Sequence, residues 1–416
     1  MLPPPSPRHW QRLLTGRLAD RAIDTVEQIA ASLTDAIATD DISADLGAGS
    51  AGMALFFAAW ADFAGDGTAR TLVHHCLQHA LDSAAAHQPG PGLYGGVAGI
   101  GWTIAHLCPD AAQDALAEID AALHTYASQS PWHGSFDLIG GLVGLGVYFL
   151  ERLPADAARA GLSEILTRLD ELAVTSEQGI TWHTPAQLVP PQQREQASDG
   201  YCNCGMAHGV PGVIAFLARC VVAGVDGNRS ERLLSGAVQW LLAEQLPAES
   251  GSAFPYWVAE NAEPMPARTA WCYGDPGVAA ALLVAAECTD REDWMCSALQ
   301  ITDRIVARPE VETELIDAPL CHGTAGLAHI LNRVWNATGE DRLALAATHW
   351  FQKTLELKRR VTLLAGFPTW KTTSHGLEWV DEPGLLEGAA GIGLALLSAV
   401  RDQPPTWDRI LLTCPT

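Results

Sequence analysis

The chain has 416 residues, 48% of them apolar, and its 25 lysines and arginines are outnumbered by 48 aspartates and glutamates, for a formal net charge of -23. This charge repels phosphate backbones and anionic membrane surfaces, which argues against nucleic acid as a partner. Charged residues or glycines interrupt every apolar run, so we expect no transmembrane segment, and the large apolar fraction predicts a globular protein that is ordered nearly throughout.

The N-terminus, Met-Leu-Pro-Pro-Pro-Ser-Pro, lacks a charged region followed by an apolar one, so it predicts no secretion signal and a cytoplasmic protein. In a reducing compartment the ten cysteines are expected to be ligands or core residues rather than disulfides. Five of them lie in apolar or helix-like runs and are predicted to be small core residues: Cys76, Cys108, Cys220, Cys288 and Cys296.

A Gly-x-x-Gly motif recurs seven times along the chain. Its copies begin at Gly49, Gly96, Gly141, Gly209, Gly274, Gly323 and Gly388. Each copy is followed by an apolar stretch with few charges, which predicts a helix buried on all sides. Between these stretches lie amphipathic segments that predict outer helices, near residues 18–35, 69–85, 113–127, 162–172, 230–245, 293–307 and 341–358.

Seven repeats of this kind cannot each form a core alone, but together they can close into two concentric rings. We therefore predict an all-α fold, an (α/α)7 double toroid or barrel with seven inner and seven outer helices, that uses residues 1–416 as a single unit. Two intervals between motifs are longer than the early ones and read as short β-containing insertions, near residues 177–199 and 361–383. Both are expected to lie over one end of the toroid.

The clearest chemical signal lies at the fifth and sixth motifs, where Cys272 stands two residues before Gly274 and the pair Cys321 and His322 stands just before Gly323. Thiolate and imidazole are ligands that zinc prefers, and three protein ligands leave a fourth tetrahedral position open. Because these residues begin consecutive inner helices, a closed ring would bring them to one level. The sequence predicts a zinc ion held by Cys272, Cys321 and His322.

A second cluster, Cys202-Asn203-Cys204 with His208 four residues on, offers an alternative metal set. His208 directly precedes Gly209 as His322 precedes Gly323, so we expect it to face the centre of the ring in its own right. A capping or buried histidine is the structural alternative for it.

Three stretches now carry a resemblance: Cys-Asn-Cys-Gly-Met-Ala-His-Gly at 202–209, Trp-Cys-Tyr-Gly-Asp-Pro-Gly at 271–277 and Cys-His-Gly-Thr-Ala-Gly at 321–326. Set among seven Gly-x-x-Gly copies, they resemble the lanthionine synthetase C family, the lanthipeptide cyclases. The resemblance covers nearly the whole chain, from about Asp45 to Leu412.

The resemblance implies a zinc enzyme that adds cysteine thiols of a precursor peptide to dehydroalanine or dehydrobutyrine, closing the thioether rings of a lantibiotic. It implies an acid/base role for His208, a positioning aspartate in Asp137, an arginine in Arg268 that pairs with Asp137 or faces the developing enolate, and a donor in Tyr273. Structural alternatives stand beside three of these roles, because Asp137 could cap a helix, Arg268 could form a surface ion pair and Tyr273 could be a packing aromatic.

Because the toroid uses the whole chain, a separate dehydratase is the expected partner that prepares the dehydrated peptide. Association with a synthetase or transporter complex would place the protein at the periphery of the inner membrane. Two alternatives remain open: a relative that binds glutathione or repairs dehydroamino acids, and a non-catalytic scaffold that holds the peptide. A toroidal glycosidase would need paired carboxylates, where the motif starts offer cysteines and histidines.

Overall fold

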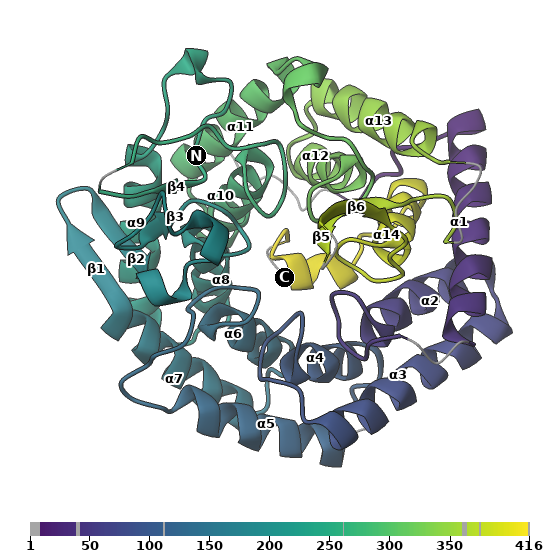
Figure 1. Cartoon of the computed structure of the whole chain (residues 1–416), viewed down its shortest axis with the longest axis horizontal. Coiled ribbons are helices and arrows are strands. Elements are labelled where there is room, and N and C mark those ends of the chain that lie inside the picture. The colour runs from purple at the N-terminus through teal and green to yellow at the C-terminus, as the bar shows by residue number, and fades with distance from the viewer. Residues whose placement is uncertain are drawn as a thin grey trace.

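Helices form two concentric rings in the computed structural model, which describes residues 9–38, 42–110, 113–260, 262–359, 364–373 and 376–414 (Figure 1). The inner ring contains α2 (Ser50–Ala64), α4 (Val97–Leu107), α6 (Leu142–Glu151), α8 (Val210–Val222), α10 (Asp275–Thr289), α12 (Thr324–Thr338) and α14 (Ala389–Val400). The outer ring contains α1 (Gly16–Ile37), α3 (Gly67–His87), α5 (Gln113–Ala127), α7 (Asp156–Leu172), α9 (Gly227–Ala243), α11 (Glu292–Ala307) and α13 (Asp341–Glu356). The predicted double toroid is confirmed.

The inner helices pack in chain order, and α14 packs on α2, so the ring closes. The second glycine of the motif makes this packing possible. A Cβ atom on Gly99 would lie 1.8 Å from the carbonyl oxygen of Leu93 and 2.8 Å from the Cβ of Leu46, which belongs to the preceding repeat. Any side chain here would push the start of α4 away from its neighbour, which explains why the motif recurs at one phase.

Backbone hydrogen bonds link the loops before the inner helices into a closed circle. The donor and acceptor pairs are Gly47 to Tyr94, Tyr94 to Ile139, Leu138 to Ala207, Ala207 to Cys272, Cys272 to Cys321, Cys321 to Leu386 and Leu386 to Gly47, with N···O distances of 2.8–3.2 Å. Residues at equivalent places in the repeats are therefore held at nearly the same level of the ring.

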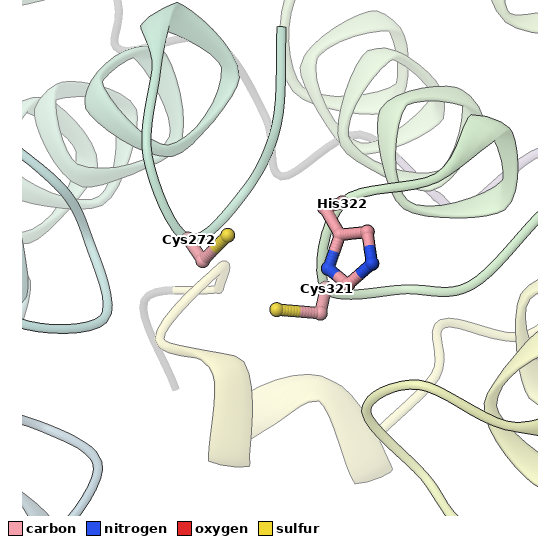
Figure 2. A group of neighbouring side chains, drawn as sticks. All are labelled: Cys272, Cys321 and His322. Atoms are coloured by element: carbon pink, nitrogen blue, oxygen red, sulfur yellow. The ribbon is translucent and has the colours of Figure 1, made fainter. Parts of the chain in front are cut away.

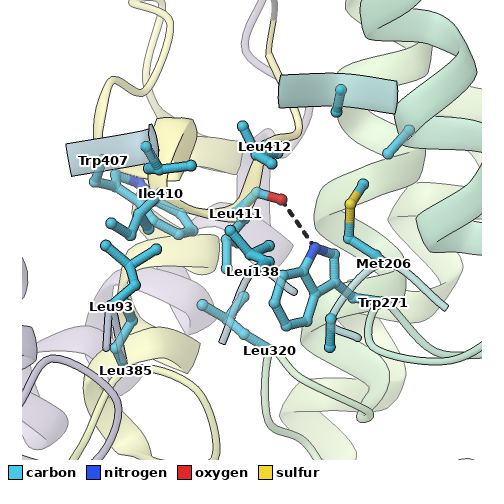
Figure 3. Packing of buried hydrophobic residues seen from close by; sticks show 14 of the residues in the cluster. Leu93, Leu138, Met206, Trp271, Leu320, Leu385, Trp407, Ile410, Leu411 and Leu412 are labelled. Atoms are coloured by element: carbon cyan, nitrogen blue, oxygen red, sulfur yellow. Dashed lines mark hydrogen bonds between the residues drawn. The ribbon is translucent and has the colours of Figure 1, made fainter. Parts of the chain in front are cut away.

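An apolar layer and the C-terminal segment fill the middle of the inner ring (Figure 3). The layer consists of one residue from each repeat, which stands three positions before the first glycine of the motif and is at most 2% exposed: Leu46, Leu93, Leu138, Met206, Trp271, Leu320 and Leu385. Against it packs the 3₁₀-helix η5 (Trp407–Leu411). The Tyr94 hydroxyl donates to the Ile410 carbonyl at 2.8 Å, and the Trp271 indole donates to the Leu411 carbonyl at 3.0 Å.

The insertions form two small antiparallel sheets. One has the order β1 (Ala173–Ser176), β2 (Gly179–Thr184), β3 (Tyr201–Asn203) and β4 (Trp257–Val258), and the other pairs β5 (Thr369–Thr373) with β6 (Gly376–Val380). Both predicted insertions thus contain strands, although residues 361–363, 374 and 375 lie outside the described ones. Strand β4 comes from the long connection between α9 and α10, where the sequence reasoning expected no strand.

Short 3₁₀ segments occur in the connections: η1 (Ala186–Leu188), η2 (Pro191–Gln193), η3 (Ala248–Ser250) and η4 (Glu310–Glu312). No disulfide joins the described cysteines. Cys76 and Cys220 are buried and Cys108 and Cys288 are partly buried, but Cys296 is exposed, so its assignment to the core is wrong: it lies on the solvent side of the amphipathic helix α11. None of the described helices is long and apolar enough to cross a membrane.

Candidate functional site

Two positions in each repeat bring side chains to the loop end of the inner ring. The first rim position, two residues before the motif, is occupied by Gly47, Tyr94, Ile139, Ala207, Cys272, Cys321 and Leu386. The second rim position, one residue before the motif, is occupied by Ala48, Gly95, Gly140, His208, Tyr273, His322 and Glu387. Apart from Tyr94, which is buried and donates its hydroxyl to the Ile410 carbonyl, the residue types that can do chemistry fall in the last four repeats.

Cys272, Cys321 and His322 converge at this end of the ring (Figure 2). One ligand atom from each lies within 4.8 Å of the others. A tetrahedral zinc ion with Zn–S bonds of about 2.3 Å would hold two thiolate sulfurs about 3.8 Å apart, so the three atoms need only a small adjustment to bind it. The donor set of two sulfurs and one imidazole suits zinc, and the cluster could hold such an ion.

Charged and polar groups surround the Cys272 thiol. A hydrogen bond from Cys321 holds the pKa of Cys272 well below its usual value, and the His322 hydrogen bond and the Arg268 charge act in the same direction. The Arg268 guanidinium donates through Nη2 to the Cys272 sulfur at 3.6 Å. These contacts favour the thiolate form of Cys272.

His208 and Asp137 form a close pair across neighbouring repeats. The distance from His208 Nδ1 to Asp137 Oδ2 is 2.6 Å. Burial lowers the pKa of His208, but the hydrogen bond and charge of Asp137 outweigh it, and the net shift is upward. The His208 side chain is 39% exposed and that of Asp137 only 11%, so the imidazole can meet a ligand while the carboxylate orients it.

Asp137 also holds its own loop, because its Oδ1 accepts the backbone N–H groups of Gly140 and Gly141, both at 3.0 Å. The two interpretations of Asp137, as a cap and as a partner of a catalytic residue, are thus compatible. One oxygen serves the turn before α6 and the other serves His208.

Arg268 and Tyr273 are placed differently from the simplest expectations. The Arg268 guanidinium contacts Cys272, the expected pairing with Asp137 is not found among the described residues, and the side chain is partly buried, so it is not a surface ion pair. The Tyr273 ring lies 5.8 Å from that of His208, and its hydroxyl accepts from Asn203 Nδ2 at 3.4 Å.

The alternative cluster of Cys202, Cys204 and His208 is not among the metal-ligating groups found in the described part of the chain. Cys204 is buried, its N–H donates to the Tyr256 carbonyl, and Cys202 pairs with Val258 in the sheet. Burial raises the pKa of both thiols.

The sequence reasoning missed Glu387, which occupies the second rim position of the seventh repeat. Its Oε2 lies 3.2 Å from the amine of Lys371 on β5. The same amine lies 2.7 Å from Oε1 of Glu382. The signal was available, because Glu387 directly precedes Gly388 as His322 precedes Gly323. Lys371 had no such signal, since a strand insertion outside the repeat supplies it.

The fold and the side chains at the rim define an α/α toroid with a candidate metal centre at the loop end of its inner ring. The chain matches the family described as lanthionine synthetase C-like protein over residues 40–412, and it belongs to that family. Among solved structures, nisin cyclase superposes with a TM-score of 0.76 at 19% sequence identity, over 93% of this chain and 96% of that one. At this identity the likeness shows the fold. No curated protein sequence matches the chain.

Proposed function

We propose that the protein is a zinc-dependent cyclase that adds cysteine thiols of a dehydrated precursor peptide to dehydroalanine or dehydrobutyrine, forming lanthionine and methyllanthionine. The observation that carries this proposal is the convergence of Cys272, Cys321 and His322 beside the His208–Asp137 pair. Membership of the lanthionine synthetase C-like family supports it.

A zinc ion bound by Cys272, Cys321 and His322 would supply a cation that keeps an incoming peptide thiol deprotonated near neutral pH. The reaction joins the thiol sulfur to the β-carbon of the dehydro residue and returns one proton to the α-carbon, so no oxidant or leaving group is needed. The thiol proton passes to solvent, and we assign to His208, whose pKa the hydrogen bond to Asp137 raises, the delivery of a proton to the α-carbon.

The remaining rim residues have supporting roles in this proposal. Arg268 stabilises the Cys272 thiolate through its charge and its contact with the sulfur. Tyr273 follows Cys272 in the chain and its ring lies 5.8 Å from that of His208. We assign to its hydroxyl the donation of a hydrogen bond to the substrate carbonyl oxygen as negative charge develops there.

The test uses a synthetic peptide with one dehydroalanine and one cysteine. Ring closure leaves the mass unchanged but removes the thiol, so resistance to iodoacetamide reports cyclisation. Cys272→Ala and His322→Ala should lose both zinc and cyclisation, while Cys204→Ala, a buried cysteine outside the group, should retain both. Full activity of the Cys272→Ala and His322→Ala variants, or the absence of zinc from the purified protein, would overturn the proposal.

Adding glutathione to the same assay separates the alternatives. An intramolecular ring supports the cyclase, whereas an adduct of glutathione with the dehydroalanine would indicate a dehydroamino-acid repair activity. In this proposal a separate enzyme dehydrates the precursor peptide. An association with a membrane-bound synthetase complex through that partner belongs to the same proposal.

A further inference from the structure

Asp317 is a buried carboxylate beside the candidate metal centre. It lies in the loop before α12, six residues before Gly323, and is only 3% exposed. A carboxylate out of contact with water needs hydrogen-bond donors or a cation nearby, and its partners therefore indicate what it does.

One oxygen of Asp317 faces both the metal centre and the β5–β6 hairpin. Oδ2 accepts the Trp370 N–H at 3.0 Å and the Thr369 hydroxyl at 3.2 Å, both from the start of β5. The same oxygen lies 3.7 Å from Nε2 of His322, slightly beyond hydrogen-bond length.

The orientation of His322 gives this contact its meaning. In Figure 2 one ring nitrogen lies on the side of the two sulfurs and the other lies away from them. An imidazole binds a metal through one nitrogen, and the hydrogen bond made by the other fixes the tautomer and the direction of the ring. Because Asp317 is next to Nε2, the nitrogen left for the ion is Nδ1.

The repeat explains why a polar side chain stands here. The position six residues before the motif holds Asn203, Arg268, Asp317 and Glu382 in the fourth to seventh repeats. Asn203 donates to Tyr273, Arg268 donates to Cys272, and Glu382 holds the Lys371 that contacts Glu387. Each of these residues supports a rim residue, and for Asp317 that residue is His322.

We propose that Asp317 is a positioning residue that orients His322 for the metal and couples the metal centre to the β5–β6 hairpin. This inference rests on the proposed function, because it assumes that the three ligands bind zinc. The hairpin also contacts the rim through the ion pair between Lys371 and Glu387, so it is held beside the metal centre at two points. Asp317 would hold His322 in place for a zinc ion while it accepts from the start of β5, so that order at the metal centre and order in the hairpin would favour each other.

The test measures zinc affinity by competition with a chromophoric chelator, and amide exchange of the hairpin with and without zinc. Asp317→Asn leaves one acceptor oxygen where the aspartate has two, and it places a donor amide against His322 or the hairpin. We expect zinc affinity to fall about 10–100-fold, as for other residues that orient a metal ligand. We also expect zinc to slow amide exchange over residues 369–373 and 376–380 in the wild type but not in the variant.

Asp275→Asn is the matched control. Asp275 is also buried beside a rim loop and accepts the Ala253 N–H at 2.8 Å and the Ser252 hydroxyl at 3.0 Å, but its hydrogen-bond partners in the described part of the chain do not include Cys272, Cys321 or His322. Zinc affinity should be unchanged in this variant. An equal loss in both variants, or none in Asp317→Asn, would overturn the proposal.

Two further outcomes are decisive. If Asp317→Asn fails to fold, Thr369→Val removes one donor to the same oxygen, and zinc-dependent protection of the hairpin at the wild-type level in that variant would refute the coupling. If the wild-type protein does not bind zinc at all, the proposed function fails first. If the wild type binds zinc but amide exchange in the hairpin does not change, the coupling between the metal centre and the hairpin is refuted, while the proposed function is not.

Discussion

Asp408 anchors the C-terminal segment in the inner ring, and replacing it tests how firmly that segment is held. The carboxylate is fully buried and contacts two residues of α12: Arg333 Nη2 at 2.5 Å and Nε at 2.6 Å, and His329 Nε2 at 2.8 Å. Asp408→Asn removes the negative charge and leaves the mostly buried Arg333 guanidinium without its ion-pair partner. We expect a loss of about 3–5 kcal/mol in the free energy of unfolding, the usual cost of breaking a buried ion pair from one side.

The expected thermal shift is small in spite of this cost. With an unfolding entropy of about 2 cal/mol/K per residue, 416 residues give about 0.9 kcal/mol/K, so the midpoint should fall by roughly 3–6 °C. Urea unfolding followed by tryptophan fluorescence is therefore the better assay. The control is Asp402→Asn, which breaks an exposed pair with Arg12 and should change stability by less than about 0.5 kcal/mol.

The pH dependence follows from the same contacts. Burial raises the pKa of Asp408, but Arg333 and His329 outweigh it, and the net pKa lies well below its usual value. Stabilisation by a carboxylate with a depressed pKa is present above the unfolded value of about 3.9 and is lost as the pH falls towards the folded value. The wild type should therefore exceed Asp408→Asn in free energy of unfolding by the whole loss of about 3–5 kcal/mol at pH 7, and this difference should become smaller as the solution is made acidic. A loss below about 1 kcal/mol at pH 7, or a double replacement Asp408→Leu with Arg333→Met as costly as the single one, would refute the reasoning.

Three more predictions concern the site. Asp137→Asn should move the fall in cyclisation rate with rising pH to lower pH, since Asp137 raises the pKa of His208; an unmoved pH–rate profile would contradict this. Gly95→Leu should fold normally, because an added Cβ meets no atom within 4 Å, but its side chain would stand at the rim and should raise the KM for the peptide. Gly67→Leu is the control: its position is equally open but lies on the outer helix α3, so KM should stay unchanged. Removal of zinc with a chelator should abolish cyclisation, and added zinc should restore it, while a chelated protein that stays active would argue for another mechanism.

Much of the architecture could be predicted from the sequence because one physical constraint repeats. A Cβ atom on the second glycine of the motif would clash with a carbonyl oxygen of the preceding loop in all seven repeats, and these clashes explain why glycine recurs at one place in each repeat. In five repeats it would also clash with a side chain of the preceding repeat: at Gly52, Gly99, Gly144, Gly277 and Gly391. Phase then places Cys272, Cys321 and His322 at one level without knowledge of the coordinates. The closed circle of backbone hydrogen bonds links residues at equivalent positions of neighbouring repeats and so holds them at this level.

What could not be predicted depends on contacts between segments that share no period. Strand β4 has two residues and pairs only because β3 lies beside it. Asp317 carries no periodic signal for its partners on β5, which follow more than fifty positions later, and Lys371 reaches Glu387 only once the hairpin folds over the rim. Asp408 lies near the C-terminus, and only the filled ring shows why a charge stands there.

The distribution of side chains around the rim links the fold to the proposed reaction. His208, Tyr273, His322 and Glu387 occupy the second rim position in the last four repeats, while Ala48, Gly95 and Gly140 occupy it in the first three and are exposed. The backbone does not require glycine at Gly95 or Gly140, because neither lies in the left-handed region and an added Cβ would touch nothing within 4 Å at either. Half of the rim thus carries the reactive groups and the other half offers open backbone. The proposed ring closure needs the peptide thiol at Cys272, Cys321 and His322 while the dehydro residue of the same peptide is at His208. The open half of the rim leaves room for the rest of that peptide.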